Sequence, residues 1–312
     1  MSYLEFVKEN ARWLAAGLLL AFASSFGQTF FISLFAAEFR TTFDLSHGEL
    51  GSIYMFATVA SAATLVQLGR LADHMRLVSL GTLSLIGLAL TCISVWAAAS
   101  WWMLLVSIYA LRLFGQGMMS HVASTAMARW FNNYRGRALG FKSLGYPCGE
   151  ALFPSLAVLL MLTVGWRQTW LLAAGALILI GLPILIWLLR QERKPSVHAA
   201  QWHAEPDAHL VRHWTRPEVL KNPLFYAVMP GVMAPACFMT ATFFNQTVLA
   251  ETKDWSLATF ASFYPAYAVA SVAAALAIGI AIDRWSARQM TPFFLLPMAV
   301  GFFVFALADS PA

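Results

Sequence analysis

The chain has 312 residues, of which 60% are hydrophobic and only 11% are charged. A water-soluble domain carries about a quarter charged residues, so this composition excludes that class and selects an integral membrane protein. The formal net charge of +5 would suggest a nucleic-acid partner in a soluble protein, but none is expected here because the charges lie between apolar runs. Cys92, Cys148 and Cys237 lie inside such runs without metal-ligand spacing, so the sequence predicts no disulfide, metal or cofactor.

Nine segments are long and apolar enough to cross a bilayer as helices. A spanning helix needs about 20 apolar residues because the hydrocarbon core is about 30 Å thick. The segments are residues 12–37, 50–68, 77–99, 101–130, 138–163, 168–189, 223–249, 257–281 and 290–308. The first run continues to Ala37 and is therefore a retained span rather than a signal peptide. The predicted fold class is an all-α integral membrane bundle.

One connection between the spans is long and polar. Residues 190–222 hold four of the seven histidines and three of the 13 prolines, with no apolar period. This stretch predicts a division into an N-terminal six-span half (1–190), a cytoplasmic linker (191–222) and a C-terminal part with three spans (223–312).

The basic residues predict which side of the membrane each connection faces. Lys and Arg beside the spans are retained on the cytoplasmic side. With a cytoplasmic N-terminus, 16 of the 20 basic residues fall on the inner side. Only Arg40, Arg167 and Lys253 fall on the outer side, and Arg112 lies within a span. We therefore expect a multi-pass protein of the cytoplasmic (inner) membrane with its N-terminus inside.

The chain contains an internal repeat. A shift of 210 residues aligns Ser46–Asp73 with Ser256–Asp283, and nine of the 28 pairs are identical. Both copies begin outside and end on the cytoplasmic side, as expected for parallel repeats about an axis along the membrane normal.

A charged loop begins within the last residues of each copy of the repeat. The first reads Gly69-Arg70-Leu71-Ala72-Asp73-His74-Met75-Arg76, and the second reads Gly279-Ile280-Ala281-Ile282-Asp283-Arg284-Trp285-Ser286-Ala287-Arg288. They resemble the motif G-x-x-x-D-R-x-G-R-R that follows spans 2 and 8 in the major facilitator superfamily of secondary transporters. His74 replaces the usual arginine, and Arg76 and Ser286 stand where the second glycine belongs. The resemblance implies a gating role for Gly69, Asp73, Arg76, Gly279, Asp283 and Arg284.

The resemblance also implies a bundle of twelve spans in two parallel repeats. The nine predicted spans supply six of the first repeat and three of the second, so the chain is expected to be C-terminally incomplete. Alternating access needs both halves. A truncated, non-transporting membrane protein is therefore one alternative.

Two ionisable residues lie deep within predicted spans. Arg112 lies eleven residues past Trp101, and Glu150 lies thirteen before Thr163, so both are roughly 16 to 20 Å below the outer helix ends. A charge inside the membrane normally finds a partner or faces a cavity. Equal depth allows an ion pair that braces the bundle. It equally allows Arg112 to attract a carboxylate and Glu150 to bind a proton reversibly.

Three glutamines complete the predicted substrate and proton pathway. Gln116 follows Arg112 by four residues and shares its helical face, and by resemblance this span borders the central cavity. Gln28 and Gln246 lie in the first and seventh spans, where packing contacts are the alternative role.

The sequence holds no H-E-x-x-H, G-x-S-x-G or phosphate-loop motif, so an enzyme is not expected. The predicted function is secondary transport of a small organic solute, a monocarboxylate-like anion, either by proton symport or by facilitated movement. The G-P-x-x-G-G ending of the family's drug antiporters is absent from the fifth span, which makes a drug or metabolite efflux antiporter the alternative.

Overall fold

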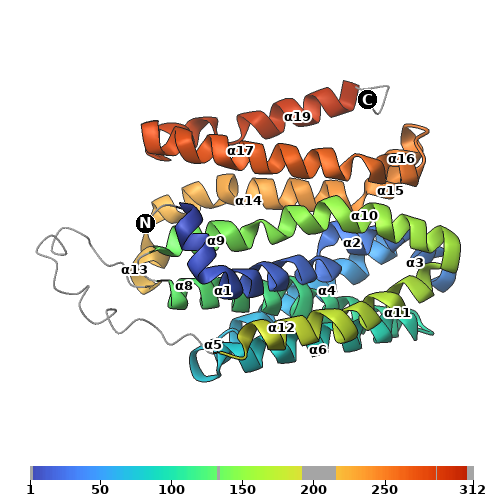
Figure 1. The fold of residues 1–312 in the computed structure, drawn as a ribbon. Coiled ribbons are helices and arrows are strands. Elements are labelled where there is room, and N and C mark those ends of the chain that lie inside the picture. Colours follow the sequence, from blue (N-terminus) through green and yellow to red (C-terminus); the bar gives the residue numbers. More distant parts are fainter. Residues whose placement is uncertain (1–2, 132–133, 192–215, 286, 308–312) are drawn as a thin grey trace, which may run out of the picture.

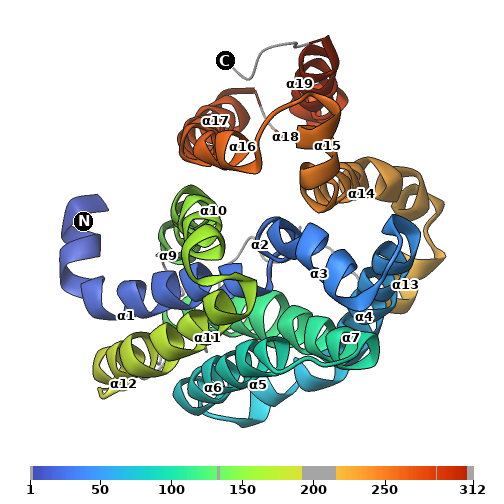
Figure 2. The same ribbon diagram turned by 90° about the vertical axis from the view of Figure 1, so that its right-hand side faces the viewer.

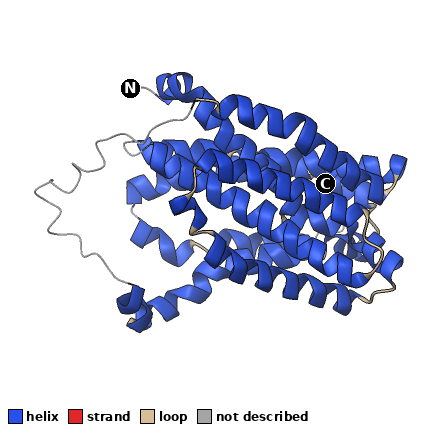
Figure 3. Ribbon diagram, turned by 90° about the horizontal axis from the view of Figure 1, so that it is seen from below, coloured by secondary structure: helices blue, strands red, loops and turns tan. Residues whose placement is uncertain are grey.

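The computed structural model describes residues 3–131, 134–191, 216–285 and 287–307, and these residues contain helices and no strands (Figure 3). Apolar composition and the absence of water in a bilayer both favour helices, which satisfy their backbone groups internally. The predicted all-α bundle is confirmed.

The helices before the linker form six groups in chain order. They are α1 (Tyr3–Ala23), η1 (Ser24–Gly27), α2 (Thr29–Ile32), η2 (Ser33–Phe35) and α3 (Ala36–Phe43); α4 (His47–Leu68) and α5 (Leu71–His74); α6 (Leu77–Trp96); α7 (Trp101–Ala110), η3 (Leu111–Met119) and α8 (Ser120–Trp130); α9 (Arg135–Ser143) and α10 (Gly145–Val164); and α11 (Trp166–Ala176), η5 (Leu177–Gly181) and α12 (Leu182–Leu189). We call this set the N-terminal group.

The helices after the linker are called the C-terminal group. They are α13 (Arg216–Lys221), α14 (Pro223–Phe244), α15 (Gln246–Thr252), α16 (Leu257–Ser262), α17 (Tyr264–Trp285), α18 (Ala287–Met290), η9 (Thr291–Phe293) and α19 (Leu296–Leu307).

By length and composition, seven helices of the described chain are able to cross a membrane. They correspond to seven of the nine predicted segments. The first predicted segment is instead a pair, Leu4–Gly27 and Thr29–Phe43, bent by 41°, which counts as an eighth span if taken together. The ninth corresponds to a shorter apolar helix, Thr291–Leu307.

The long helices run side by side as one bundle (Figure 1). An end-on view places α14, α17 and α19 along one side of the N-terminal group, and α10 contacts both α16 and α17 (Figure 2). The buried hydrophobic core lies mainly within the N-terminal group, whereas α14 and α19 bury none of their described residues.

The repeat is visible in the backbone at the start of its two helices. Ser46 Oγ accepts from Glu49 N–H at 3.2 Å, and Ser256 Oγ accepts from Thr259 N–H at 3.0 Å. Two residues before each cap stands the pair Asp44 and Asp254, which are the described non-glycine residues with positive φ, at 51° and 56°. These aspartates are also 210 residues apart, so the same turn precedes both copies.

The first and fourth spans are irregular, and their irregular parts touch. Gln28 interrupts the first span with an extended backbone, at φ −82° and ψ 154°. In the fourth span, η3 is a π-helical segment, a form that is rare and often found at functional sites. Gly27 and Gly115 face each other at this crossing, and a Cβ added to Gly115 would lie 2.6 Å from Gly27 Cα.

We expect Gly115→Ala to lower stability. The added methyl group would meet backbone atoms of Gly27, which a rotamer change cannot move, and such overpacking costs about 1–3 kcal/mol. The measurement is the thermal unfolding midpoint of the purified chain in detergent. Gly175→Ala in α11 is the matched control because a Cβ there meets nothing within 4 Å. Equal midpoints for the two variants would contradict the close crossing.

Candidate functional site

The break in the first span leaves a backbone carbonyl without its helical partner. In an unbroken helix Phe31 N–H would donate to Gly27 O, but it donates to Gln28 O at 3.2 Å. An unsatisfied carbonyl at membrane depth costs several kcal/mol, so non-helical backbone persists there only against protein or a water-filled cavity. The break therefore needs a donor from another helix.

Arg112 supplies that donor from the π-helical segment. Its Nη1 donates to Gly27 O and to Thr29 Oγ1, each at 3.3 Å. Its guanidinium carbon lies 5.3 Å from the centre of the Tyr54 ring, and the Tyr54 and Thr29 hydroxyls are 2.7 Å apart. Arg112 is only 8% exposed. It therefore links the first, second and fourth spans around the break.

The possible ion pair between Arg112 and Glu150 does not form in the described structure. Arg112 bonds to the broken helix and Tyr54, while Glu150 is half-buried on α10 without a hydrogen-bond or salt-bridge partner among the described residues. Equal depth allows an ion pair, but it does not determine the direction in which each helix turns its side chain.

A polar cavity of about 460 Å³ lies beside this crossing. Its walls come from the broken span, the fourth span and α10, and its lining residues are Gln28, Phe30, Gln116, Ser120, Tyr146 and Glu150. The structure thus brings together three of the five predicted pathway residues. Arg112 stands behind the wall, one turn from Gln116, and is not among the lining residues.

The lining offers both hydrogen-bond acceptors and donors. Gln116 Oε1 is buried and has no partner within the described structure. Glu150 is the one charged residue among those that line the cavity. A carboxylate and two amides are suited to holding a small polar molecule or a proton.

Sequence reasoning missed Lys142. It was counted with the cytoplasmic connection before the fifth span, but the span helix begins at Arg135 and Lys142 is only 4% exposed. The signal was present, because Lys142 lies four residues before Tyr146 and eight before Glu150, which places all three on one helical face.

Gln246 has a different place from the other predicted pathway residues. It is fully buried, and its Nε2 donates to Phe30 O at 2.8 Å and to Ser33 Oγ at 2.7 Å. Its Oε1 accepts from the Tyr264 hydroxyl at 2.5 Å, and Ser33 Oγ donates to Phe243 O at 2.6 Å. Gln246 therefore fastens the C-terminal group to the N-terminal group and is not among the residues that line the cavity.

The predicted gating loops are described only in part. Gly69 O lies 3.1 Å from His121 Nε2, and Arg129 Nη1 donates to Ala72 O at 2.5 Å, so α8 holds the first loop. Arg76 is exposed. The side chains of Asp73, Asp283 and Arg284 and the surroundings of Gly279 lie outside the described residues, and the gating role of the six motif residues stays a prediction.

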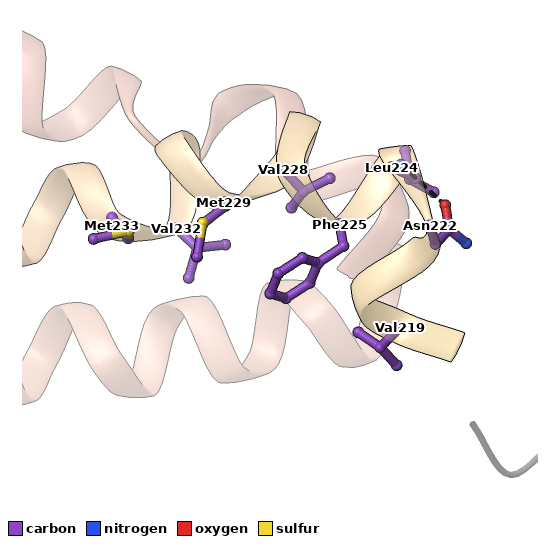
Figure 4. Close-up of a pocket in the computed structure, with 8 residues that line it drawn as sticks. All are labelled: Val219, Asn222, Leu224, Phe225, Val228, Met229, Val232 and Met233. Carbon is purple, nitrogen blue, oxygen red and sulfur yellow. Dashed lines mark hydrogen bonds between the residues drawn. The ribbon is translucent and has the colours of Figure 1, made fainter. Parts of the chain in front are cut away.

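A second hollow, of about 500 Å³, lies along α13 and the start of α14 (Figure 4). It is lined by Val219, Asn222, Leu224, Phe225, Val228, Met229, Val232 and Met233. Its polar member, Asn222, already caps α14 by accepting from Leu224 N–H at 2.9 Å. The hollow offers apolar surface without convergent polar groups, so the cavity beside Glu150 is the better candidate site.

Apolar spanning helices, two irregular segments in contact and a polar cavity between them define a membrane transport protein. The family model described as Major Facilitator Superfamily matches residues 17–312, so the chain belongs to this family. The predicted membership is confirmed, and the chain is a secondary transporter rather than a member of an enzyme family. No curated protein matches the chain.

We expect Gln246→Leu to weaken the junction between the two helix groups. The substitution removes the donors to Phe30 O and Ser33 Oγ and leaves the buried Tyr264 hydroxyl without its acceptor, at a cost of about 1–2 kcal/mol. The thermal unfolding midpoint should fall. Thr242→Val is the control, because its hydroxyl is exposed and bonds only its own helix at Phe238 O. Equal midpoints would show that the junction depends on other contacts.

Proposed function

We propose that this transporter moves a small organic solute, a monocarboxylate-like anion, by alternating access with proton coupling. The observation that carries the proposal is the cavity itself, where Glu150, a carboxylate with no partner among the described residues, lies beside the crossing of a broken helix and a π-helical segment. Its volume of about 460 Å³ suits a small solute, since ligand cavities span about 300–1,000 Å³.

The charges around the cavity support an anion that travels with a proton. Two buried cations, Arg112 and Lys142, stand behind its walls, and Glu150 is the carboxylate within it. When Glu150 is ionised, its charge opposes entry of an anion. Once Glu150 is protonated, the fixed charge of the surroundings is positive and favours an anion. Solute and proton would then enter together.

Alternating access requires two bodies that move relative to each other. We propose that these are residues 1–190 and 223–312, joined by a cytoplasmic linker at 191–222, in the cytoplasmic membrane with the N-terminus inside. The parallel repeat and the excess of basic residues on one side support this arrangement.

Efflux of a cationic drug or metabolite by antiport is the second candidate. One observation favours it: the charged residue that lines the cavity is a carboxylate without a partner in the described structure. An antiporter of this kind would exchange the cation for the proton on Glu150.

Glu150→Gln should abolish proton coupling. The amide keeps the size of the side chain but cannot release a proton, so an inward proton gradient should no longer accelerate uptake of labelled pyruvate into proteoliposomes. Exchange of internal for external pyruvate, which needs no net proton movement, should continue.

Glu251→Gln is the matched control because Glu251 is exposed at the end of α15. A Glu150→Gln variant that responds to the gradient like the wild type would refute the coupling role, and uptake of organic cations instead would favour the antiporter.

Arg112→Ala should reduce pyruvate uptake by about tenfold or more, because Gly27 O and Thr29 Oγ1 lose the donor that holds the break open beside the cavity. Arg190→Ala, at an exposed position after α12, serves as the control. Gel filtration should show both variants as monodisperse before uptake is compared. Unchanged uptake in Arg112→Ala would remove this residue from the mechanism.

A further inference from the structure

One face of the fifth span carries a row of polar side chains, and only some of them line the cavity. Lys142, Tyr146 and Glu150 follow one another at intervals of four residues. The helix runs from Arg135 to Val164, so the three side chains stand one above the other. Tyr146 and Glu150 line the cavity, whereas Lys142 lies one turn beyond it.

Lys142 is buried and has no counter-ion among the described residues. Its Nζ donates to Tyr146 Oη at 2.8 Å and to Ser124 Oγ at 3.1 Å, and it lies 4.6 Å from the centre of the Tyr146 ring. No salt bridge joins it to a carboxylate of the described chain, although it is only 4% exposed. Two neutral hydroxyls do not neutralise an ammonium group, so a positive charge remains next to the cavity. Buried charges in membrane helices are costly and usually functional.

The contact with Lys142 determines what Tyr146 can do. An ammonium group only donates hydrogen bonds, so the Tyr146 oxygen must accept from it. The hydroxyl hydrogen of Tyr146 then points elsewhere, and no acceptor for it lies in the described protein. Since Tyr146 lines the cavity, this hydrogen is available to a molecule inside it. Polarisation by the neighbouring charge makes the hydroxyl a stronger donor.

Ser124 holds Lys142 in place from the opposite wall. Its hydroxyl accepts from Lys142 and donates to Ser120 O at 2.8 Å. Ser120 itself lines the cavity. The ammonium group is therefore fixed between α8 and the fifth span, and cannot turn away from Tyr146 without losing both bonds.

We propose that Tyr146 binds the anionic group of the solute and that Lys142 is the positioning residue that makes it an obligatory donor. This inference rests on the proposed function and assigns anion recognition to Lys142 and Tyr146 rather than to Arg112, which is occupied at the break. Glu150 lies one turn further along the same face, about 6 Å away by helix geometry. The solute anion and the coupled proton would thus occupy adjacent places on one helix.

The test compares an anion with its neutral counterpart. Uptake of labelled pyruvate and of labelled pyruvamide is measured in proteoliposomes of the full chain for the wild type, Lys142→Met, Lys142→Arg, Tyr146→Phe and the double variant Lys142→Met/Tyr146→Phe. Lys221→Met is the matched control, because Lys221 is exposed at the end of α13. Lys142→Met and Tyr146→Phe should each raise KM for pyruvate by about tenfold. KM for pyruvamide should change far less.

Two further results separate positioning from mere support of the fold. The double variant should be no worse than Tyr146→Phe, because Lys142 acts on the solute only through the Tyr146 hydroxyl that this variant already lacks. Lys142→Arg should recover most of the affinity for pyruvate, since arginine also donates to Tyr146 and keeps the charge. Loss of fold would instead reduce transport of both solutes in proportion.

Each outcome decides something different. A wild type that transports pyruvate, with the same KM in Lys142→Met and Tyr146→Phe, would overturn this inference and leave the proposed function intact. An equal loss for pyruvate and pyruvamide would show that Lys142 only braces the helices. A wild type that neither transports nor binds acetate, lactate or pyruvate, with binding followed by thermal shift, would overturn both the inference and the anion class of the proposed function.

Discussion

The arrangement of the site depends on one requirement, which is a donor for the carbonyl of Gly27. The first span is interrupted at Gln28 in a medium that offers no water to the freed backbone. Arg112 meets the requirement, and in doing so it brings the second and fourth spans to the break through Thr29 and Tyr54. Removing the donor would favour a continuous helix, and Gln28 would lose the position from which it lines the cavity.

Most of the fold follows from composition and period, because every spanning helix must be long and apolar whatever its neighbours are. The interruption of the first span was not predictable in this way. No proline marks it, and the polar residues near it, Ser24, Ser25, Gln28 and Thr29, are too few to mark the end of a span. The break is stabilised by a residue 85 positions away, Arg112, and by a close approach of Gly27 to Gly115. Such a contact has no local signature.

The sequence predicted three of the six residues that line the cavity, but it did not predict which contacts each residue makes. Glu150 was selected by its depth, Gln116 by the helical face it shares with Arg112, and Gln28 as a polar residue of the first span, and the three do meet around one cavity. Depth follows from counting residues, whereas direction depends on helix rotation, and η3 departs from the α-helical period at Arg112. Gln246 passed the same polarity criterion yet serves the junction between the helix groups. Lys142 was missed because a lysine near a span end is usually a solvated flank.

The repeat gives two equivalent tyrosines different duties. Tyr54 lies 210 residues before Tyr264, and each offers its hydroxyl to the interior of the bundle. The first helps to hold Arg112 beside the cavity, and the second holds Gln246 where the helix groups meet. Equivalent residues in the two copies of the repeat therefore make different contacts. A substitution at Tyr54 would disturb the surroundings of Arg112, whereas one at Tyr264 would disturb the contact between the two helix groups.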